Sequence, residues 1–263
     1  MPSARLRQRC EKLKCKCRSD ECCAPGILVL NKSPCRSVFE RSCWHMKRSL
    51  FKYFTRSCYA NDFLDGKLLF RSLAYFRDDE DLARGDQYEG TTVFRPEGGL
   101  HIHNQTHRTH STLPLSFESS VKAHEIFVYC VSQTFSPALV QEFGAVACVE
   151  ITQISVFCER IRSALPASAT FKTRAVDYYA ASQEGSPRWA LPDAIATSKL
   201  DYWARQNEYR FLFSLTGALG FEEVKLRLVD RNQRPARIPD HHQSFPLQTT
   251  TLRDFCRLHD VNA

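Results

Sequence analysis

The pattern of apolar and polar residues predicts a short aromatic strand over residues 50–54, with the sequence Leu-Phe-Lys-Tyr-Phe. A helical run over 59–64 follows and ends at an Asp-Gly pair, because glycine tolerates positive φ. A second strand is expected over 67–70, and residues 72–76 then lead into the segment 77–89, which is rich in carboxylates and arginines. Apolar strands that lead into a charged loop are a common frame for a functional site.

The rest of the chain shows strands and helices that mix without regular βαβ alternation. Ser136 is expected to cap a helix over 137–143, with Pro137 in its first position. The other segments follow from hydrophobic periodicity: strands over 91–94, 125–131, 145–151, 171–179, 209–213 and 223–229, a weaker one at 237–238, and helices over 156–165, 194–203 and 250–259. The predicted fold class is therefore α+β, with a split, largely antiparallel sheet and flanking helices.

Composition is that of a globular protein with one sizeable core. The chain has 263 residues, of which 43% are hydrophobic and 25% charged. No run of 18 apolar residues is present, so no transmembrane helix is expected. The apolar run 26–30 is too short for the core of a signal peptide. We therefore expect a cytoplasmic protein without membrane contact, or one exported by a route that leaves no recognisable signal.

The basic charge is concentrated at the N-terminus. Twelve basic and four acidic residues in the first fifty give a formal charge of +8, whereas the whole chain carries +7. Seven of the 12 cysteines also precede residue 45, but none forms a CxxC pair, which favours free thiols over a zinc site. Residues 1–48 are expected to form a poorly ordered tail before a single domain over 49–263. The alternative is a tail that contacts nucleic acid or another anionic surface.

Two further clusters contain residue types that bind metals. His101 and His103 would share one face of a strand, and His107 and His110 follow. No carboxylate stands among them at a familiar spacing, so an exposed polar hairpin is favoured over a ligand set or a metal-dependent hydrolase. The carboxylates within 78–89 are expected to pair with neighbouring arginines rather than to hold a divalent cation.

Gln206 and Glu208 stand at the start of the strand expected over 209–213 and would share one of its faces. A carboxylate there can stabilise a positively charged transition state or accept a hydrogen bond from a hydroxyl, and an amide can orient a second substrate. The alternative is a surface Glu208 paired with Arg210 or Lys199, worth about 0–1 kcal/mol. On the pattern alone, the surface pair is the simpler interpretation.

Lys52 and Tyr53 place a cation and an aromatic ring next to each other on the first strand. Such a pair can hold a phosphate and stack on a ring. The alternative is an edge strand with one exposed lysine. The signatures of P-loop proteins, Rossmann folds, serine hydrolases and zinc deaminases are absent from the sequence.

Several of these segments together resemble a widespread bacterial domain family of unknown function, whose members share a layout of KYxS, GxLxF, DxxE and WxxExEYR motifs. The matching residues are 51–54, 66–70, 75–78, 85–90, Lys199, Trp203 and 207–210. The resemblance covers about residues 50–215 and leaves the tail outside. This layout is associated with the ADP-ribosyltransferase-like fold of toxins, effectors and phage-defence proteins.

The resemblance implies a protein that transfers ADP-ribose from NAD to a macromolecule, protein or nucleic acid, or that hydrolyses NAD. Glu208 would be the catalytic acid, which hydrogen-bonds the ribose and favours an oxocarbenium-like transition state. Gln206 would stand two residues before it, as in members of the Gln-x-Glu type. Lys52 would stand where such enzymes place an Arg or His that holds NAD.

The resemblance also implies a strand hydroxyl near the nicotinamide ribose, either Ser72 or Ser132, and a stacking ring, either Tyr53 or Tyr75. The sequence departs from the family pattern because it has no Ser-Thr-Ser triplet and carries Lys52 in place of Arg or His. These departures leave open a second hypothesis, a non-catalytic module of a defence or effector protein that senses a nucleotide or binds nucleic acid. The enzyme hypothesis requires the lysine, a strand serine and the glutamate to converge on one cleft.

Overall fold

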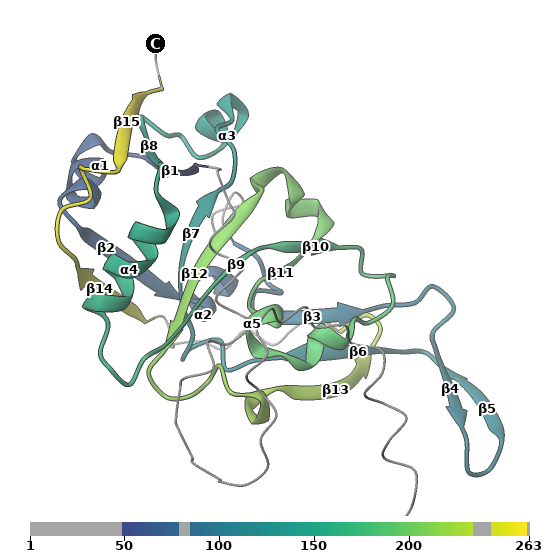
Figure 1. Ribbon diagram of the computed structural model, residues 1–263. Coiled ribbons are helices and arrows are strands. Elements are labelled where there is room, and N and C mark those ends of the chain that lie inside the picture. The colour runs from purple at the N-terminus through teal and green to yellow at the C-terminus, as the bar shows by residue number, and fades with distance from the viewer. Residues whose placement is uncertain (1–48, 79–84, 234–242, 262–263) are drawn as a thin grey trace, which may run out of the picture. The chain divides into compact units, whose positions relative to one another are not determined.

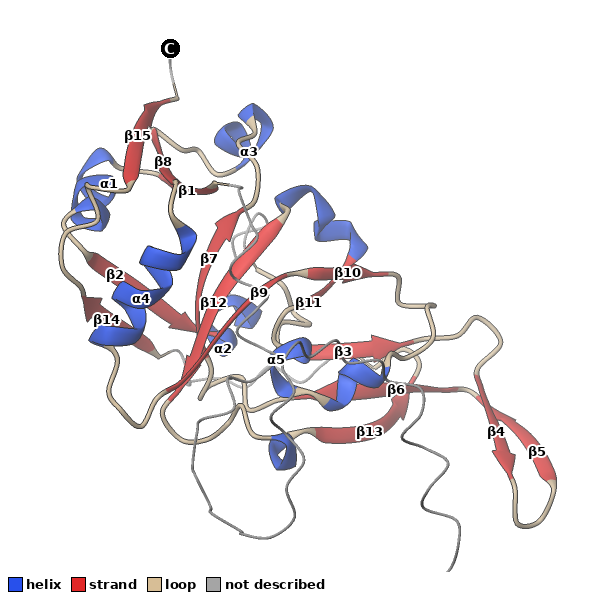
Figure 2. Ribbon diagram, in the orientation of Figure 1, coloured by secondary structure: helices blue, strands red, loops and turns tan. Residues whose placement is uncertain are grey.

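The computed structural model describes residues 49–78, 85–233 and 243–261. These residues form β-sheets of eight, three, two and two strands, with short helices around them (Figures 1 and 2). The strand pairs are antiparallel except for one, between β10 (Asp177–Tyr179) and β11 (Ser198–Leu200). The expected α+β class with mostly antiparallel sheets is confirmed. The predicted tail and the weak strand at 237–238 lie outside the described residues.

The largest sheet is organised around one central strand, β7 (Phe127–Ser132). Along one edge, β12 (Glu208–Ser214) pairs with β7 from Glu208–Ser132 to Phe213–Phe127. Beyond β12 lies β9 (Thr170–Ala175). Every residue of β12 is buried, including the charged Glu208 and Arg210 at its start.

The other edge of β7 is shared by two strands, so the sheet forks. Strand β1 (Leu50–Phe54) pairs with β7 only at Phe51–Ser132, while β2 (Lys67–Ser72) pairs at Arg71–Val128 and Ser72–Phe127. The branch through β1 continues with β8 (Ala147–Ile151) and β15 (Cys256–Asp260), and the branch through β2 continues with β14 (Ser244–Gln248).

The fork leaves the middle of β7 open. Among the described residues, 129–131 have no strand partner on the edge that β1 and β2 share. The Lys52 ammonium lies in this gap and donates a hydrogen bond to the backbone oxygen of Cys130, 2.8 Å away. A side chain thus replaces one missing ladder bond.

Helices cover the sheet with apolar faces at helical spacing. Helix α4 (Ile154–Ala164) buries Phe157 and Ile161, and Phe157 meets Phe211 of β12 edge-on at 4.9 Å between ring centroids. Helix α3 (Pro137–Glu142) begins as predicted, because the Ser136 hydroxyl accepts a hydrogen bond from the backbone N–H of Leu139. The other helices among the described residues are α1 (Ser57–Leu64), α2 (Leu73–Asp78), α5 (Pro192–Ile195), η2 (Pro187–Ala190), η3 (Asp201–Gln206) and η4 (Phe221–Glu223).

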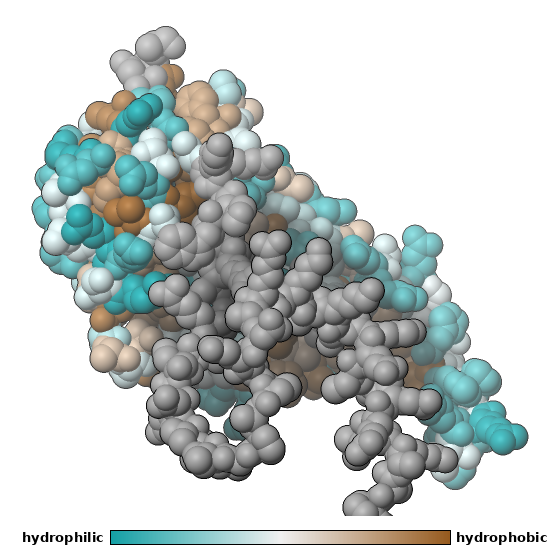
Figure 3. Space-filling model, viewed as in Figure 1, coloured by the Kyte–Doolittle hydropathy of each residue, from teal (hydrophilic) through white to brown (hydrophobic). Residues whose placement is uncertain are grey.

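A smaller sheet joins β13 (Lys225–Asp230), β6 (Leu115–Ser120) and β3 (Thr91–Phe94). The hairpin of β4 (Leu100–Asn104) and β5 (Thr109–Leu113) extends away from this sheet, at the lower right of Figure 1. Its surface is hydrophilic (Figure 3) and its side chains are mostly exposed. The exposed polar hairpin expected from the sequence is confirmed.

The helix predicted over 194–203 is wrong. This region contains the last part of α5, then β11, and then the first part of η3. The backbone N–H of Asp177 bonds to the Thr197 oxygen, and β11 continues that pairing along β10. Residues 194–199 are buried, so tertiary pairing overrides the helical periodicity of the segment.

The helix predicted over 250–259 is also wrong, because its second half forms β15, which completes the edge of β8. Strand β14 was not predicted at all, although it covers the edge of β2. The strand predicted over 171–179 is two strands in different sheets, since the backbone leaves β9 at Val176. Residues 73–78, which were expected only to lead into the charged segment, form helix α2. Such edge pairings depend on distant partners that local periodicity does not reveal.

Candidate functional site

A pocket of about 610 Å³ opens where the sheet forks. It is lined by residues from both branches, from the open stretch of β7 and from the start of β12. Six of the seven predicted site residues line it: Lys52, Tyr53, Tyr75, Ser132, Gln206 and Glu208.

Ser72 is the predicted residue that does not line this pocket. Its side chain is fully buried at the end of β2. Its hydroxyl accepts a hydrogen bond from the backbone N–H of Gln243 at 3.2 Å. Ser132 is therefore the serine that the structure brings beside the predicted acid, since it is paired with Glu208 across the β7–β12 ladder.

Glu208 is buried at the floor of the pocket, with 7% of its surface exposed. Lys199 Nζ lies 2.6 Å from Glu208 Oε1, and Arg210 Nε lies 2.9 Å from Glu208 Oε2. The backbone N–H of Glu208 donates to the Tyr178 hydroxyl at 2.9 Å. The alternative of a surface glutamate is wrong, although both cations named as its partners do contact it.

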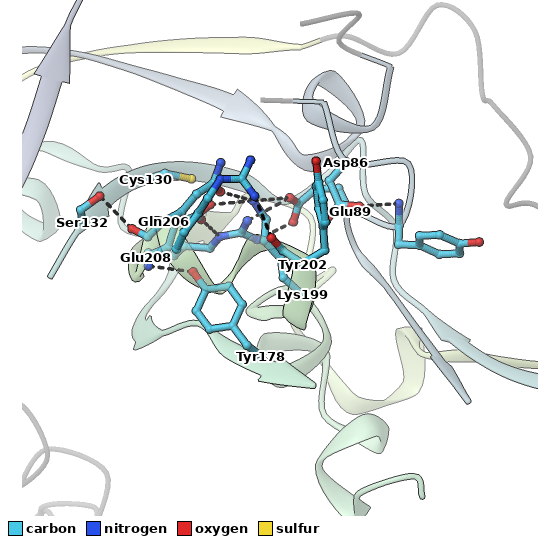
Figure 4. Close-up of polar contacts among 12 residues, drawn as sticks. Asp86, Glu89, Cys130, Ser132, Tyr178, Lys199, Tyr202, Gln206 and Glu208 are labelled. Atoms are coloured by element: carbon cyan, nitrogen blue, oxygen red, sulfur yellow. Dashed lines mark hydrogen bonds and ion pairs between the residues drawn. The ribbon is translucent and has the colours of Figure 1, made fainter. Parts of the chain in front are cut away.

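Gln206 reaches the same place by a different route from the one expected. It lies in η3, and the next residue, Asn207, turns the chain with a left-handed φ of 42° before β12 begins. Lys199 Nζ donates to Gln206 Oε1 at 3.1 Å, and the Ser132 hydroxyl donates to the Gln206 backbone oxygen at 2.9 Å. Figure 4 shows Lys199, Gln206 and Glu208 pointing toward one another. A turn, not strand alternation, brings the amide beside the carboxylate.

A second carboxylate completes the floor. Arg210 is bound through both terminal nitrogens to Glu89, with a distance of 2.9 Å between Arg210 Nη2 and Glu89 Oε2. Lys199 Nζ also lies 3.7 Å from Glu89 Oε2. Glu89, Lys199, Glu208 and Arg210, which we call the ionic cluster, are all buried, and their formal charges cancel.

The ionic cluster keeps its members charged despite burial. Burial by itself would raise the pKa of Glu208, but Lys199 and Arg210 outweigh it and lower this pKa to about 2. Burial would likewise lower the pKa of Lys199, and the nearby carboxylates of Glu208 and Glu89 raise it instead. At neutral pH, Glu208 is therefore an ionised carboxylate at the base of a pocket.

Asp86 lies beside this cluster, and its pKa is raised whereas that of Glu208 is lowered. Burial raises its pKa to about 6, and repulsion from Glu89 adds to the effect. Oδ1 accepts the backbone N–H of Tyr88 at 2.9 Å. Oδ2 is buried and has no hydrogen-bond partner among the described residues. Asp86 therefore carries an energetic cost when it ionises, in contrast to Glu208.

The upper walls of the pocket combine rings with basic groups. Lys52 Nζ lies 4.5 Å from the centre of the Tyr129 ring, and the Arg71 guanidinium lies 4.6 Å from the centre of the Tyr75 ring. The Tyr53 hydroxyl accepts the backbone N–H of Ser136 at 2.8 Å, which ties the wall of the pocket to the start of α3. An aromatic, basic wall above a floor that contains the ionised Glu208 suits a ligand with rings, hydroxyls and negative charge.

From the sequence, Lys199 and Arg210 were expected as possible surface partners of Glu208, and Glu89 as part of an ion-paired loop; all three also matched the family layout, but none was predicted as a site residue. One signal was present in the sequence. Arg210 lies within the strongly apolar strand that follows Glu208, and a buried arginine requires buried carboxylates. The sequence did not indicate which carboxylate is the second partner of Arg210, because Glu89 is 121 residues away in the chain.

The histidines of the hairpin are not grouped as a set of metal ligands. The rings of His103 and His110 are stacked, with centroids 4.2 Å apart, and His101 Nδ1 is 2.8 Å from the Thr112 hydroxyl. Within the described ranges, no three His, Cys, Asp or Glu side chains are grouped so that they could hold a metal ion. Of the acidic segment 78–89, residues 79–84 lie outside those ranges.

Comparison with known proteins adds no name to this site. No protein-family model matches the chain, and neither a curated protein nor a solved structure matches it. None of the helices among the described residues is both long and apolar enough to cross a membrane.

Proposed function

We propose that this chain has an ADP-ribosyltransferase-like fold and activity, using NAD to modify a macromolecule or hydrolysing NAD. One observation supports the proposal above the others: six residues expected at such a site line a single pocket with an ionised carboxylate at its floor. Lys52, Ser132 and Glu208 come from three strands that meet at the fork of the sheet. The enzyme hypothesis requires these three residues to converge on one cleft, which could not be tested from the sequence alone.

In the proposed reaction, the bond between the nicotinamide nitrogen and ribose C1′ breaks, and its electron pair leaves with nicotinamide. Positive charge develops on the ribose, as in other reactions with oxocarbenium-like transition states. Glu208 accepts a hydrogen bond from a ribose hydroxyl and stabilises this charge. Water or a nucleophile of the target then bonds to C1′ and loses its proton.

Glu208 retains the capacity for this role although it is already paired. A carboxylate has about four lone-pair sites on its two oxygens. The hydrogen bonds from Lys199 and Arg210 engage one site on each oxygen. These contacts also fix the orientation of the carboxylate, which reduces the reorganisation needed when substrate binds.

The same contacts favour a second candidate function, a module that binds a nucleotide without cleaving it. Lys199 and Arg210 place two positive charges beside the carboxylate, and these oppose the build-up of a further positive charge on the ribose. On this hypothesis the pocket senses a nucleotide for a defence or effector protein. Contact of the basic tail with nucleic acid would belong to it, although that tail lies outside the described residues.

The test is nicotinamide release from NAD by the purified full chain, with cell lysate supplied as acceptor. We expect Glu208→Gln to lower the rate by about 10²–10⁴-fold, because the amide cannot supply the negative charge. Glu223→Gln is the matched control, since Glu223 is a partly exposed carboxylate paired with Lys122 outside the pocket.

Equal rates for the wild type and Glu208→Gln would contradict the role of Glu208. No release by the wild-type protein, together with measurable NAD binding, would replace the transferase with the nucleotide-sensing module. Circular dichroism of each variant shows whether a lost rate reflects lost chemistry or lost fold.

A further inference from the structure

The central strand β7 sets the spacing between the two ends of the pocket. Glu208 is opposite Ser132 across one edge of this strand, while Arg71 is opposite Val128 across the other. At about 3.4 Å per residue, the rows of Glu208 and Arg71 are roughly 14 Å apart along the strand. The pocket therefore extends well beyond the group that would contact the carboxylate.

The charged residues that line the pocket leave a positive excess. The ionic cluster is neutral as a whole, and Asp62 pairs with Lys67 at 2.8 Å. Lys52 and Arg71 are the other charged residues of the lining, so its formal balance is +2. A ligand that fills the whole pocket is favoured when it carries about two negative charges.

Arg71 is held in position at the end of the pocket far from Glu208. Its guanidinium lies over the Tyr75 ring, and Nη1 donates to the Ser244 hydroxyl. That hydrogen bond uses one of five N–H donors on a planar group whose geometry matches a phosphate. Along β7, the Lys52 ammonium lies between the rows of Arg71 and Glu208, because it bonds to the backbone oxygen of Cys130, which stands between Val128 and Ser132.

We propose that Arg71 and Tyr75 form a second subsite, which binds the phosphate-bearing distal nucleotide of a dinucleotide. The inference rests on the proposed function, since it assigns the distal half of the same ligand. Lys52 and Arg71 hold the diphosphate between them, and Glu208 meets the ribose at the other end. Arg71 is then a specificity-determining residue that selects a diphosphate-containing ligand over a nucleoside or a ribose phosphate.

The test is the binding of adenosine, AMP and ADP to the full chain, measured by isothermal titration calorimetry. For the wild type, we expect ADP to bind at least about tenfold more tightly than adenosine, because charge-assisted hydrogen bonds to phosphate are the stronger kind. Arg71→Gln removes most of that preference, and Arg71→Lys retains part of it. Arg253→Gln, which removes an exposed arginine paired with Asp65 outside the pocket, leaves it unchanged.

ADP that binds no more tightly than adenosine would overturn the inference, as would an unchanged preference in Arg71→Gln. Inorganic pyrophosphate should displace ADP from the wild type, which gives a test that needs no variant. If the protein binds ADP through Arg71 but releases no nicotinamide, the subsite is supported and the proposed activity is refuted. If wild type and Arg71→Gln cleave NAD with the same KM, the activity is supported and the subsite is refuted.

Discussion

The ionic cluster and the β4–β5 hairpin are both dense in polar side chains, but burial separates them. The cluster draws Glu89, Lys199, Glu208 and Arg210 from distant parts of the chain and removes them from solvent. The hairpin takes its four histidines from one short segment and leaves all of them exposed. Buried charges persist only where opposite charges and hydrogen bonds compensate them, whereas exposed polar groups are solvated wherever they lie.

The difference shows that density of polar residues in a sequence is weak evidence for a site. Four histidines within ten residues suggested ligands, and the structure arranges them as an open ladder without a metal-binding group among the described residues. Glu208 suggested a surface ion pair, and the structure encloses it with two cations. The pocket is distinguished by buried carboxylates whose pKa values are shifted, and the sequence pattern reveals neither the burial nor the shifts.

The largest expected effect comes from removing a cation from the ionic cluster. Arg210→Met leaves two buried carboxylates with Lys199 as the cation that contacts both. We expect the free energy of unfolding to fall by about 3–5 kcal/mol, measured by urea denaturation, because an uncompensated charge remains buried. Adding Glu89→Gln to this variant should restore part of the stability, since the carboxylate released by Arg210 is then neutral. A double variant less stable than Arg210→Met would refute the proposed compensation.

An intermediate effect, dependent on pH, is expected for Asp86→Asn. The folded protein holds the pKa of Asp86 at about 6, above its ordinary 3.8, so the folded state binds the proton more tightly. Stability from this group therefore rises as pH falls from about 6 to about 4, and ionisation above pH 6 costs stability. Asp86→Asn should raise the free energy of unfolding at pH 7.5 by on the order of 2 kcal/mol and flatten this part of the profile.

The pH scan for this variant should stay above about pH 4.5. Below that value, Glu208 acts in the opposite direction, because its pKa of about 2 lies below its ordinary 4.5 and its contribution to stability is lost as pH falls. Thermal unfolding of wild type and Asp86→Asn between pH 4.5 and 8 provides the measurement. Parallel curves of stability against pH for the two proteins would show that Asp86 does not cause the pH dependence in this range.

The smallest effect is expected in the hairpin. His103→Ala removes one ring of the stacked pair with His110 on an exposed ribbon. We expect the free energy of unfolding to change by less than about 0.5 kcal/mol at pH 8, measured by urea denaturation as for Arg210→Met. A loss above about 1.5 kcal/mol would mean that the hairpin stabilises the fold as strongly as a buried element, and the comparison would fail.

The sequence by itself determined the elements whose signals are local. The aromatic strand 50–54, the apolar strands around 127–132 and 208–214, and the helix that Ser136 caps were all predicted, because alternation, apolar runs and capping chemistry act over a few residues. The sequence also identified candidate residues of the pocket, including Lys52 and Glu208.

Only the tertiary structure decided which of these residues meet and in what state. Strands β11, β14 and β15 form because distant edges need partners, and their own sequences favoured other structures or gave no signal. The fork in the sheet places Lys52 beside Cys130, and folding brings Glu89 to Arg210 across 121 residues. Burial then sets the ionisation of Glu208 and Asp86 in opposite directions, because it depends on how many compensating charges surround each carboxylate.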